Sequence, residues 1–121
     1  MQFIGEPRHN IKVSKQLYLK GVSKLRKDTN GQYKNESVTR FANYLICQTF
    51  TDEQLAHSNV EGTDGRTVLK ADPRFIAVIS EVSQTCKINI CLDTENTEFK
   101  FMREKINDLC RMKRYKYNHR V

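Results

Sequence analysis

The sequence predicts an all-α fold, a compact bundle of about five helices with long connecting loops and little or no sheet. Three observations lead to this expectation. Apolar residues recur at helical spacing in several segments, two segments open with helix-capping patterns, and strand-like alternation is almost absent. The chain has 121 residues, 38% of them hydrophobic and 9% aromatic, which suits a single domain over 1–121.

The first half of the chain contains two expected helices. Residues 1–13 include a glycine and a proline and are expected to form an extended arm. Ser14 suits the N-cap of a helix over about 15–27. Its residues expected to face inward are Leu17, Val22 and Leu25. A turn-rich loop follows, and Ser37 is expected to begin a second helix that continues to Phe50.

Capping patterns mark the starts of the next two helices. Residues 51–54 (TDEQ) match a capping box, so a short helix is expected there, ending near Ser58. After a loop with two glycines, Asp72 and Pro73 form an N-cap followed by a first-turn proline, which predicts a helix to about Gln84. Residues 87–92 (KINICL) alternate, but a lone strand would have nothing to pair with. The final helix is expected over about 98–115.

Charge divides the chain into two basic ends and an acidic centre. The formal net charge is +7, with residues 8–40 carrying +7, residues 41–99 carrying −5 and residues 100–121 carrying +6. A phosphate backbone suits such ends, because each lysine or arginine that neutralises a phosphate releases a counterion. The alternative is a charged surface that serves only solubility.

Other classes of protein are less well supported. No apolar run approaches the ~20 residues that span a bilayer. The four cysteines and three histidines lack zinc-ligand spacing, and no residue pattern provides a nucleophile with its base. Cys47 and Cys110 instead occupy apolar helical positions. We therefore expect no metal, no cofactor, no catalysis and no membrane partner.

The final helix combines an apolar stripe with a basic face. Phe99, Met102, Ile106, Leu109 and Cys110 follow helical spacing, and Lys100, Arg103, Asn107, Arg111 and Arg114 share a neighbouring face. Lys113 and Lys116 extend this charge into a basic tail over 116–121. All of these basic residues and Asn107 are candidates for phosphate contact, although a solvated face, a nuclear-import patch or a frayed tail would show the same composition.

Several blocks together resemble the BEN domain, a helical DNA-binding module of transcriptional repressors and chromatin proteins. They are RFANYLICQTFTDEQLAHSNVEG at 40–62, LKADPRFIAVI at 69–79, INDLCRMKRYK at 106–116 and the opening FIGEPRHNIKV. Two positions depart from the family's pattern. Leu109 stands where a lysine is usual before Cys110, and Ala71 separates Lys70 from the Asp-Pro pair. The closest resemblance is to insect proteins with a BEN domain and no other recognised domain.

The resemblance implies a sequence-specific domain that binds double-stranded DNA, in a nuclear repressor or boundary factor. It places the start of the last helix near base edges in the major groove. The candidates for reading bases are Asp93, Glu95, Asn96, Thr97 and Lys100. It also implies that related domains pair on palindromic sites, which makes a second copy an expected partner, and that corepressor proteins are expected partners as well.

Basic residues outside the last helix complete the expected interface. Arg8, Lys12 and Lys15 are candidates for a minor-groove or phosphate contact by the arm. Arg40, near a helix start, and Arg66, in the two-glycine loop, are further phosphate candidates. Two other functions remain open: a protein-interaction module with basic surfaces, and an RNA-binding domain that uses the C-terminal tyrosines.

Overall fold

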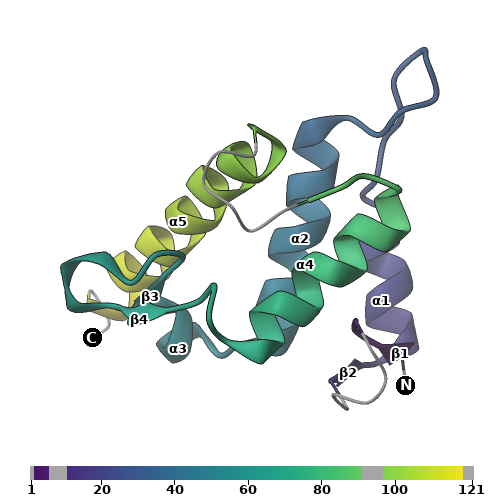
Figure 1. Ribbon diagram of the computed structural model, residues 1–121. Coiled ribbons are helices and arrows are strands. Elements are labelled where there is room, and N and C mark those ends of the chain that lie inside the picture. The colour runs from purple at the N-terminus through teal and green to yellow at the C-terminus, as the bar shows by residue number, and fades with distance from the viewer. Residues whose placement is uncertain (1, 6–10, 91–96, 119–121) are drawn as a thin grey trace.

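The computed structural model describes residues 2–5, 11–90 and 97–118, and is mostly helical (Figure 1). Within these ranges it has five α-helices: α1 (Lys15–Val22), α2 (Asn35–Thr49), α3 (Asp52–Ala56), α4 (Pro73–Cys86) and α5 (Thr97–Asn118). The expected helical content is therefore confirmed, and four of these helices lie close to their predicted ranges, whereas α1 ends at Val22 and not near residue 27.

Two small sheets distinguish the structure from a purely α-helical fold. Strand β1 (Gln2–Phe3) pairs antiparallel with β2 (Lys12–Val13). Strand β3 (Ser58–Asn59) pairs parallel with β4 (Thr67–Val68), and the 3-10 helix η2 (Thr63–Gly65) lies between them. Each strand has two residues. A strand this short has no alternating pattern that a sequence could reveal.

The described parts of residues 1–13 are extended, as expected, but they are folded back on the body and do not project as an arm. The backbone N–H of Ile4 donates to the carbonyl of Ile11 at 2.7 Å, and the Ile4 side chain is fully buried. The N–H of Gly5 donates to Glu81 Oε1 of α4 at 3.2 Å. This segment is therefore part of the folded domain.

Helix α2 lies between the other long helices (Figure 1). Helix α1 packs against one side of α2, α4 packs along its length, and α5 contacts both α2 and α3. The short α3 and strand β3 lie beside the C-terminal half of α5. This arrangement places α5 at one end of the molecule and the β1–β2 sheet at the other.

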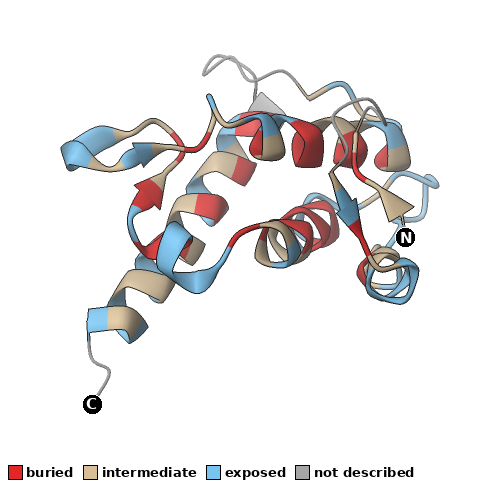
Figure 2. Ribbon diagram, turned by 90° about the horizontal axis from the view of Figure 1, so that it is seen from below, coloured by how far each residue is buried: buried red, intermediate tan, exposed pale blue. Residues whose placement is uncertain are grey.

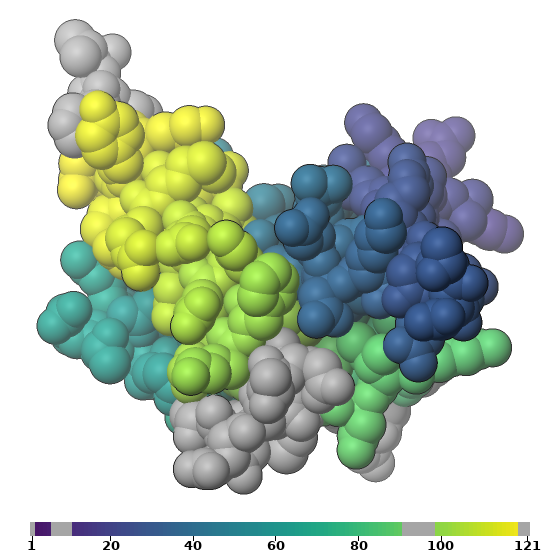
Figure 3. Space-filling view, turned by 90° about the horizontal axis from the view of Figure 1, so that it is seen from above, coloured from purple at the N-terminus to yellow at the C-terminus, as the bar shows by residue number. Residues whose placement is uncertain are grey.

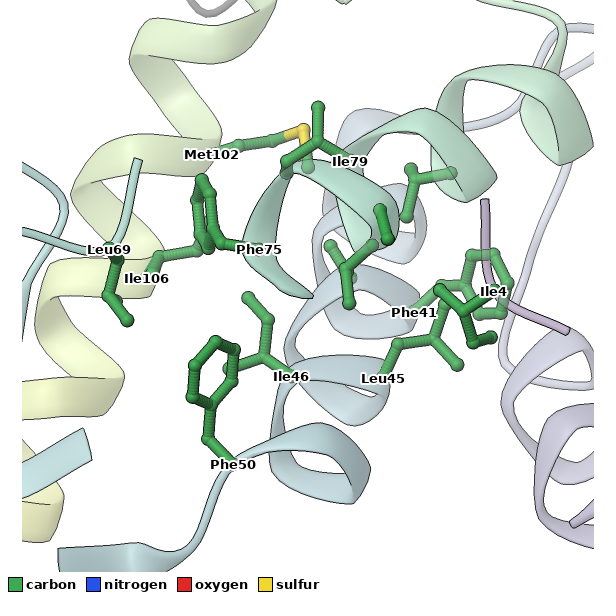
Figure 4. Packing of buried hydrophobic residues seen from close by; sticks show 14 of the residues in the cluster. Ile4, Phe41, Leu45, Ile46, Phe50, Leu69, Phe75, Ile79, Met102 and Ile106 are labelled. Atoms are coloured by element: carbon green, nitrogen blue, oxygen red, sulfur yellow. The ribbon is translucent and has the colours of Figure 1, made fainter. Parts of the chain in front are cut away.

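A single hydrophobic core joins these elements (Figure 4). Helix α2 contributes Phe41, Leu45 and Ile46, which recur at helical spacing and are fully buried. Facing residues come from α4, α5 and the N-terminal segment: Phe75, Ile79, Met102, Ile106 and Ile4. The buried residues lie on the inward faces of α2, α4 and α5 (Figure 2). Each helix is therefore held in place by an amphipathic surface, as the helical spacing requires.

The capping predictions hold for α3 and α4 and differ for α2. The Thr51 hydroxyl accepts from the N–H of Gln54 at 3.1 Å, and the Gln54 side chain accepts from the N–H of Thr51 at 2.9 Å. Asp72 caps α4 with Pro73 in the first turn. Helix α2 instead begins two residues before Ser37, whose hydroxyl donates to backbone carbonyls of the preceding loop.

Helix α1 is shorter than predicted and is turned differently. Leu17, expected inward, is 37% exposed. Tyr18 points toward the core instead, where its hydroxyl donates to Glu81 Oε2 at 2.6 Å. Gly21 permits close contact with α2, because a Cβ added there would lie 2.8 Å from Cδ1 of Tyr44. The helix is thus positioned by a polar contact and a glycine that hydrophobic spacing alone does not reveal.

Candidate nucleic-acid interface

Four of the five residues of the predicted apolar stripe of α5 form a buried seam, and Leu109 is half-buried. Phe99, Met102, Ile106 and Cys110 all lie in the hydrophobic core and are at most 2% exposed. Met102 lies beside Ile79 of α4, and Ile106 lies beside Phe75 of α4 and Leu69 (Figure 4). The seam therefore fixes α5 to the body over about three helical turns.

One flank of α5 also carries polar contacts to α3 and β3. Arg114 donates from Nε to the carbonyl of Ala56 at 3.1 Å and from Nη2 to the carbonyl of Ser58 at 3.4 Å. These carbonyls belong to the C-terminal end of α3 and the residues just after it, where a helix lacks internal partners for its carbonyl groups. Arg114 therefore caps α3 from a distance of 58 residues in sequence.

Asn107 holds the next stretch of chain on the same flank. Its Oδ1 accepts from the backbone N–H of Val60 at 2.9 Å, and the Val60 side chain is fully buried. One turn earlier, Arg103 pairs with Glu61 at 3.5 Å, and Glu61 also accepts from Lys70. The loop after β3 is thus attached to α5 by side chains from successive turns.

Two further contacts lie near the end of α5. Lys113 Nζ pairs with Asp52 Oδ1 at 3.0 Å, and this hydrogen bond raises the pKa of the Lys113 ammonium. The Tyr117 ring packs edge-on against His57, with ring centroids 5.2 Å apart. Tyr117 is therefore not presented as an open stacking platform for a base.

These contacts correct the expectation of one exposed basic face. Of its five members, Arg103, Asn107 and Arg114 are half-buried and bind α3, β3 or the loop between β3 and β4. We call the four residues that attach α5 to the segment from α3 to the loop after β3 the clamp residues: Arg103, Asn107, Lys113 and Arg114. The three cations among them already have partners within the protein, since Arg103 and Lys113 pair with acids of the central segment and Arg114 binds carbonyls.

The remaining cations of α5 face solvent. Lys100, Lys105, Arg111 and Lys116 are exposed, and we call them the outer cations. Arg111 forms an ion pair with Asp108 at 2.6 Å, in which both side chains are more than half exposed. Such pairs contribute little energy and exchange easily. The outer cations are therefore available to an external polyanion.

Most of the predicted base-reading residues lie at the edge of the described chain. Asp93, Glu95 and Asn96 fall outside the described residues. Thr97 is the first residue of α5, and Lys100 lies one turn into the helix and is exposed. The positive end of the helix dipole lies at this end of α5.

The N-terminal candidates do not join the α5 surface. Arg8 lies outside the described residues. Lys12 lies in β2, with its ammonium 5.0 Å from the centroid of the Phe3 ring, and Lys15 begins α1. Both belong to the end of the molecule away from α5 (Figure 1). Lys12 and Lys15 are therefore separated in space from the basic residues of α5.

Arg40 and Arg66 lie on opposite sides of α5. Arg66 follows η2 in the loop beside α5 and is half-buried. Arg40 is exposed on α2, where it lines a hollow together with Lys105 of α5. Sequence reasoning did not identify Lys24, Arg26 or Lys105 as members of a shared basic surface, because Lys24 and Arg26 lie just after α1 whereas Lys105 lies on α5.

The thiols fit the expected structural role. Burial raises the pKa of Cys110 and of Cys86 to about 11, and burial also raises the pKa of Cys47. A thiol of this kind is mostly protonated at neutral pH and is a poor nucleophile. Among the described residues, no three His, Cys, Asp or Glu side chains are grouped to bind a metal ion.

Within the described ranges, none of the helices combines the length and the apolar composition that crossing a bilayer requires.

Comparison of the chain with protein-family models, with curated proteins and with solved structures found no match.

Proposed function

We propose that this chain is a sequence-specific double-stranded DNA-binding domain of a nuclear transcriptional repressor or chromatin boundary factor. The observation that carries the proposal is the state of α5. A buried seam and the clamp residues fix this helix to the body, while its outer cations remain exposed. The resemblance of the sequence blocks to the BEN domain supports the same function.

A fixed helix has an advantage in reading DNA. The major groove admits an α-helix, and base discrimination requires side chains that hold their positions against base edges. In the proposed complex, the start of α5 enters the groove, and Asn96, Thr97 and Lys100 approach the bases. Asp93 and Glu95 provide acceptors for cytosine amino groups.

Phosphate contact is assigned to three of the outer cations rather than to the clamp residues, since the fourth, Lys105, lines the hollow toward α2. Lys100, Arg111 and Lys116 occupy the exposed side of α5, whereas Arg103, Lys113 and Arg114 have partners within the protein. Each phosphate contact on duplex DNA adds about 0.9 to the slope of log affinity against log salt. The clamp residues thus act indirectly, by holding the helix.

The experiment is a selection from a random duplex library, followed by binding measurements on the enriched site at several salt concentrations. An enriched motif is expected, and a palindromic motif would indicate that two copies bind together. Lys100→Ala or Arg111→Ala should reduce the salt slope by about one. Lys20→Ala, an exposed lysine on α1, is the matched control and should leave the slope unchanged.

Base reading is tested separately. Asn96→Ala or Thr97→Ala should reduce the preference for the selected site over a mismatched site by about 1–3 kcal/mol for a true base contact. The proposal would be overturned if the selection enriched no motif and if random competitor duplex abolished all binding of the protein to DNA. Preferential binding of structured RNA in direct competition would assign the surface to RNA instead.

A further inference from the structure

A groove crosses α2, on the side of α5 opposite Arg103, Asn107 and Arg114. It consists of two adjoining hollows that share Arg40 and Asn43 as lining residues. The hollow of about 550 Å³ lies between α2 and α5, and the hollow of about 470 Å³ lies between α2 and the loop after α1. The space-filling view shows the surface hollowed between α5 and α2 (Figure 3). Hollows of this size fall in the range of ligand-binding sites.

The groove has an apolar floor. Phe101, Leu109 and Met112 of α5 line the larger hollow, and Met112 is 45% exposed. Tyr44 of α2 contributes its ring to the smaller hollow. Apolar side chains left open between two packed helices favour an occupant that brings apolar groups of its own.

The rim of the groove is predominantly basic. Its lining cations come from the loop after α1, from α2 and from α5: Lys24, Arg26, Arg40 and Lys105. Two acids, Glu36 and Asp108, also line it, and Asp108 is already paired with Arg111. A partner with negative charge on either side of an apolar strip would match this distribution.

Two polar groups on the α2 wall lack partners. Asn43 Oδ1 and the Tyr44 hydroxyl are buried atoms with no hydrogen-bond partner within the described part of the chain. Leaving such a group unpaired destabilises the protein relative to a state in which the group is hydrogen-bonded. Both residues line the hollows, so a bound chain that reorients these side chains can supply the missing hydrogen bonds.

We propose that this groove binds an acidic amphipathic helix of a partner protein. Helix-in-groove recognition uses apolar anchors at i, i+3 or i+4, and i+7, which suits a floor formed by Phe101, Leu109 and Met112. Carboxylates beside the anchors then face the four basic residues of the rim. A DNA backbone matches the charge but offers no apolar strip for the floor. The groove therefore has a different occupant from the outer side of α5, and this inference does not depend on DNA binding.

The experiment measures binding of three designed peptides of about 15 residues by fluorescence anisotropy. One is an amphipathic helix with leucine anchors and glutamates, the second has lysines in place of the glutamates, and the third is the acidic peptide in scrambled order. The acidic amphipathic peptide is expected to bind most tightly. In NMR spectra it should shift the amide signals of Asn43, Tyr44, Leu109 and Met112.

Charge reversal provides the decisive variant. Arg40→Glu combined with Lys105→Glu should weaken binding of the acidic peptide by at least about tenfold and strengthen binding of the lysine peptide. Both residues are exposed, so the variant is expected to keep its unfolding midpoint. Lys20→Glu together with Lys34→Glu changes the net charge equally at exposed positions outside the lining of the groove and should leave binding unchanged.

A second measurement uses Cys47, which lines the smaller hollow and is half-buried. In a Cys91→Ser background, bound acidic peptide should slow alkylation of Cys47. Equal binding of the acidic and scrambled peptides, or no protection of Cys47, would overturn the proposal. The proposal would also be overturned if duplex DNA shifted the NMR amide signals of the groove residues and the acidic peptide did not. That result would assign Arg40 and Lys105 to the DNA surface.

Discussion

The two flanks of α5 have different environments. On one flank, Arg103, Asn107 and Arg114 contact α3, β3 and the loop after β3. On the other flank, Lys105 and Met112 line an open groove toward α2. The polar side chains of the first flank bind groups of the protein itself, whereas the second flank borders an open hollow.

This difference separates positive charge in the sequence from positive charge that a partner can reach. Residues 100–121 carry +6, but Arg103 and Lys113 pair with acids of the central segment, and Arg114 binds backbone carbonyls. The acidic centre of the sequence is thus partly used to hold the basic helix. A binding surface should therefore be assigned from the cations that remain exposed.

If the clamp residues hold α5 to the body, removing one of them should lower the free energy of unfolding. Arg114→Ala leaves the carbonyls of Ala56 and Ser58 without their charged donor, and it should lower the free energy of unfolding by about 2 kcal/mol. Arg111→Ala, in an exposed pair one turn away, should change it by less than about 0.5 kcal/mol. Urea denaturation measures both, through a shift of the midpoint at constant slope. Equal effects of the two variants would contradict the clamp.

Asn107 tests the clamp through a neutral hydrogen bond. Asn107→Ala removes the acceptor of the Val60 N–H and should lower the free energy of unfolding by about 1–2 kcal/mol. Asn107→Asp keeps an acceptor oxygen at this position and should cost less. If the two substitutions cost the same, the hydrogen bond to Val60 is not what holds the loop.

Much of the fold followed from the sequence because it rests on local signals. The local signals are the capping box at Thr51, the Asp72-Pro73 helix start, and the apolar stripes of α2 and α5, which include Phe41 and Ile106. Each signal involves residues close together in sequence, so its spacing is visible in the chain. Helix α1 was predicted less well, because Tyr18 is directed by a contact to Glu81, 63 residues away.

The candidate interface was harder to predict because its residues contact groups that are distant in sequence. The helical spacing of Arg103, Asn107 and Arg114 correctly indicates that they share one side of α5, but it carries no information about what faces that side. Their partners, Glu61 and the carbonyls after α3, come from a distant segment. A basic helix preceded by acidic residues at 52, 53 and 61 is a weak signal of such pairing.

The buried seam between the flanks can be tested by pH. Burial raises the pKa of Cys110 to about 11 from an ordinary value of 9.0. The unfolded chain therefore releases this proton at lower pH than the folded chain, so stability should be retained at neutral pH and lost as pH rises from about 9 toward 11. The loss attributable to this thiol is at most about 1.4 kcal/mol per pH unit.

The measurement compares urea midpoints between about pH 8 and pH 10 under reducing conditions. Cys110→Ala should flatten the decline with pH relative to the unmodified protein. Cys47→Ala is the matched control on the groove side and should flatten it less, because Cys47 is only half-buried. A steeper decline in the Cys110→Ala variant would show that the seam thiol is not protonated preferentially in the folded state.

The smallest expected effect belongs to the ion pair between Lys113 and Asp52. The Lys113 side chain is 17% exposed, but Asp52 is 79% exposed, so solvent screens the pair even though the nitrogen and oxygen lie 3.0 Å apart. A double-mutant cycle with Lys113→Ala and Asp52→Ala should therefore give a coupling energy of about 0.5 kcal/mol, reduced further by high salt. A coupling above about 2 kcal/mol would mean that the charged pair, and not the backbone contacts of Arg114 and Asn107, dominates the clamp. Because the pair lies near the end of α5, that result would also place the firmest attachment of the helix far from the end proposed to read DNA.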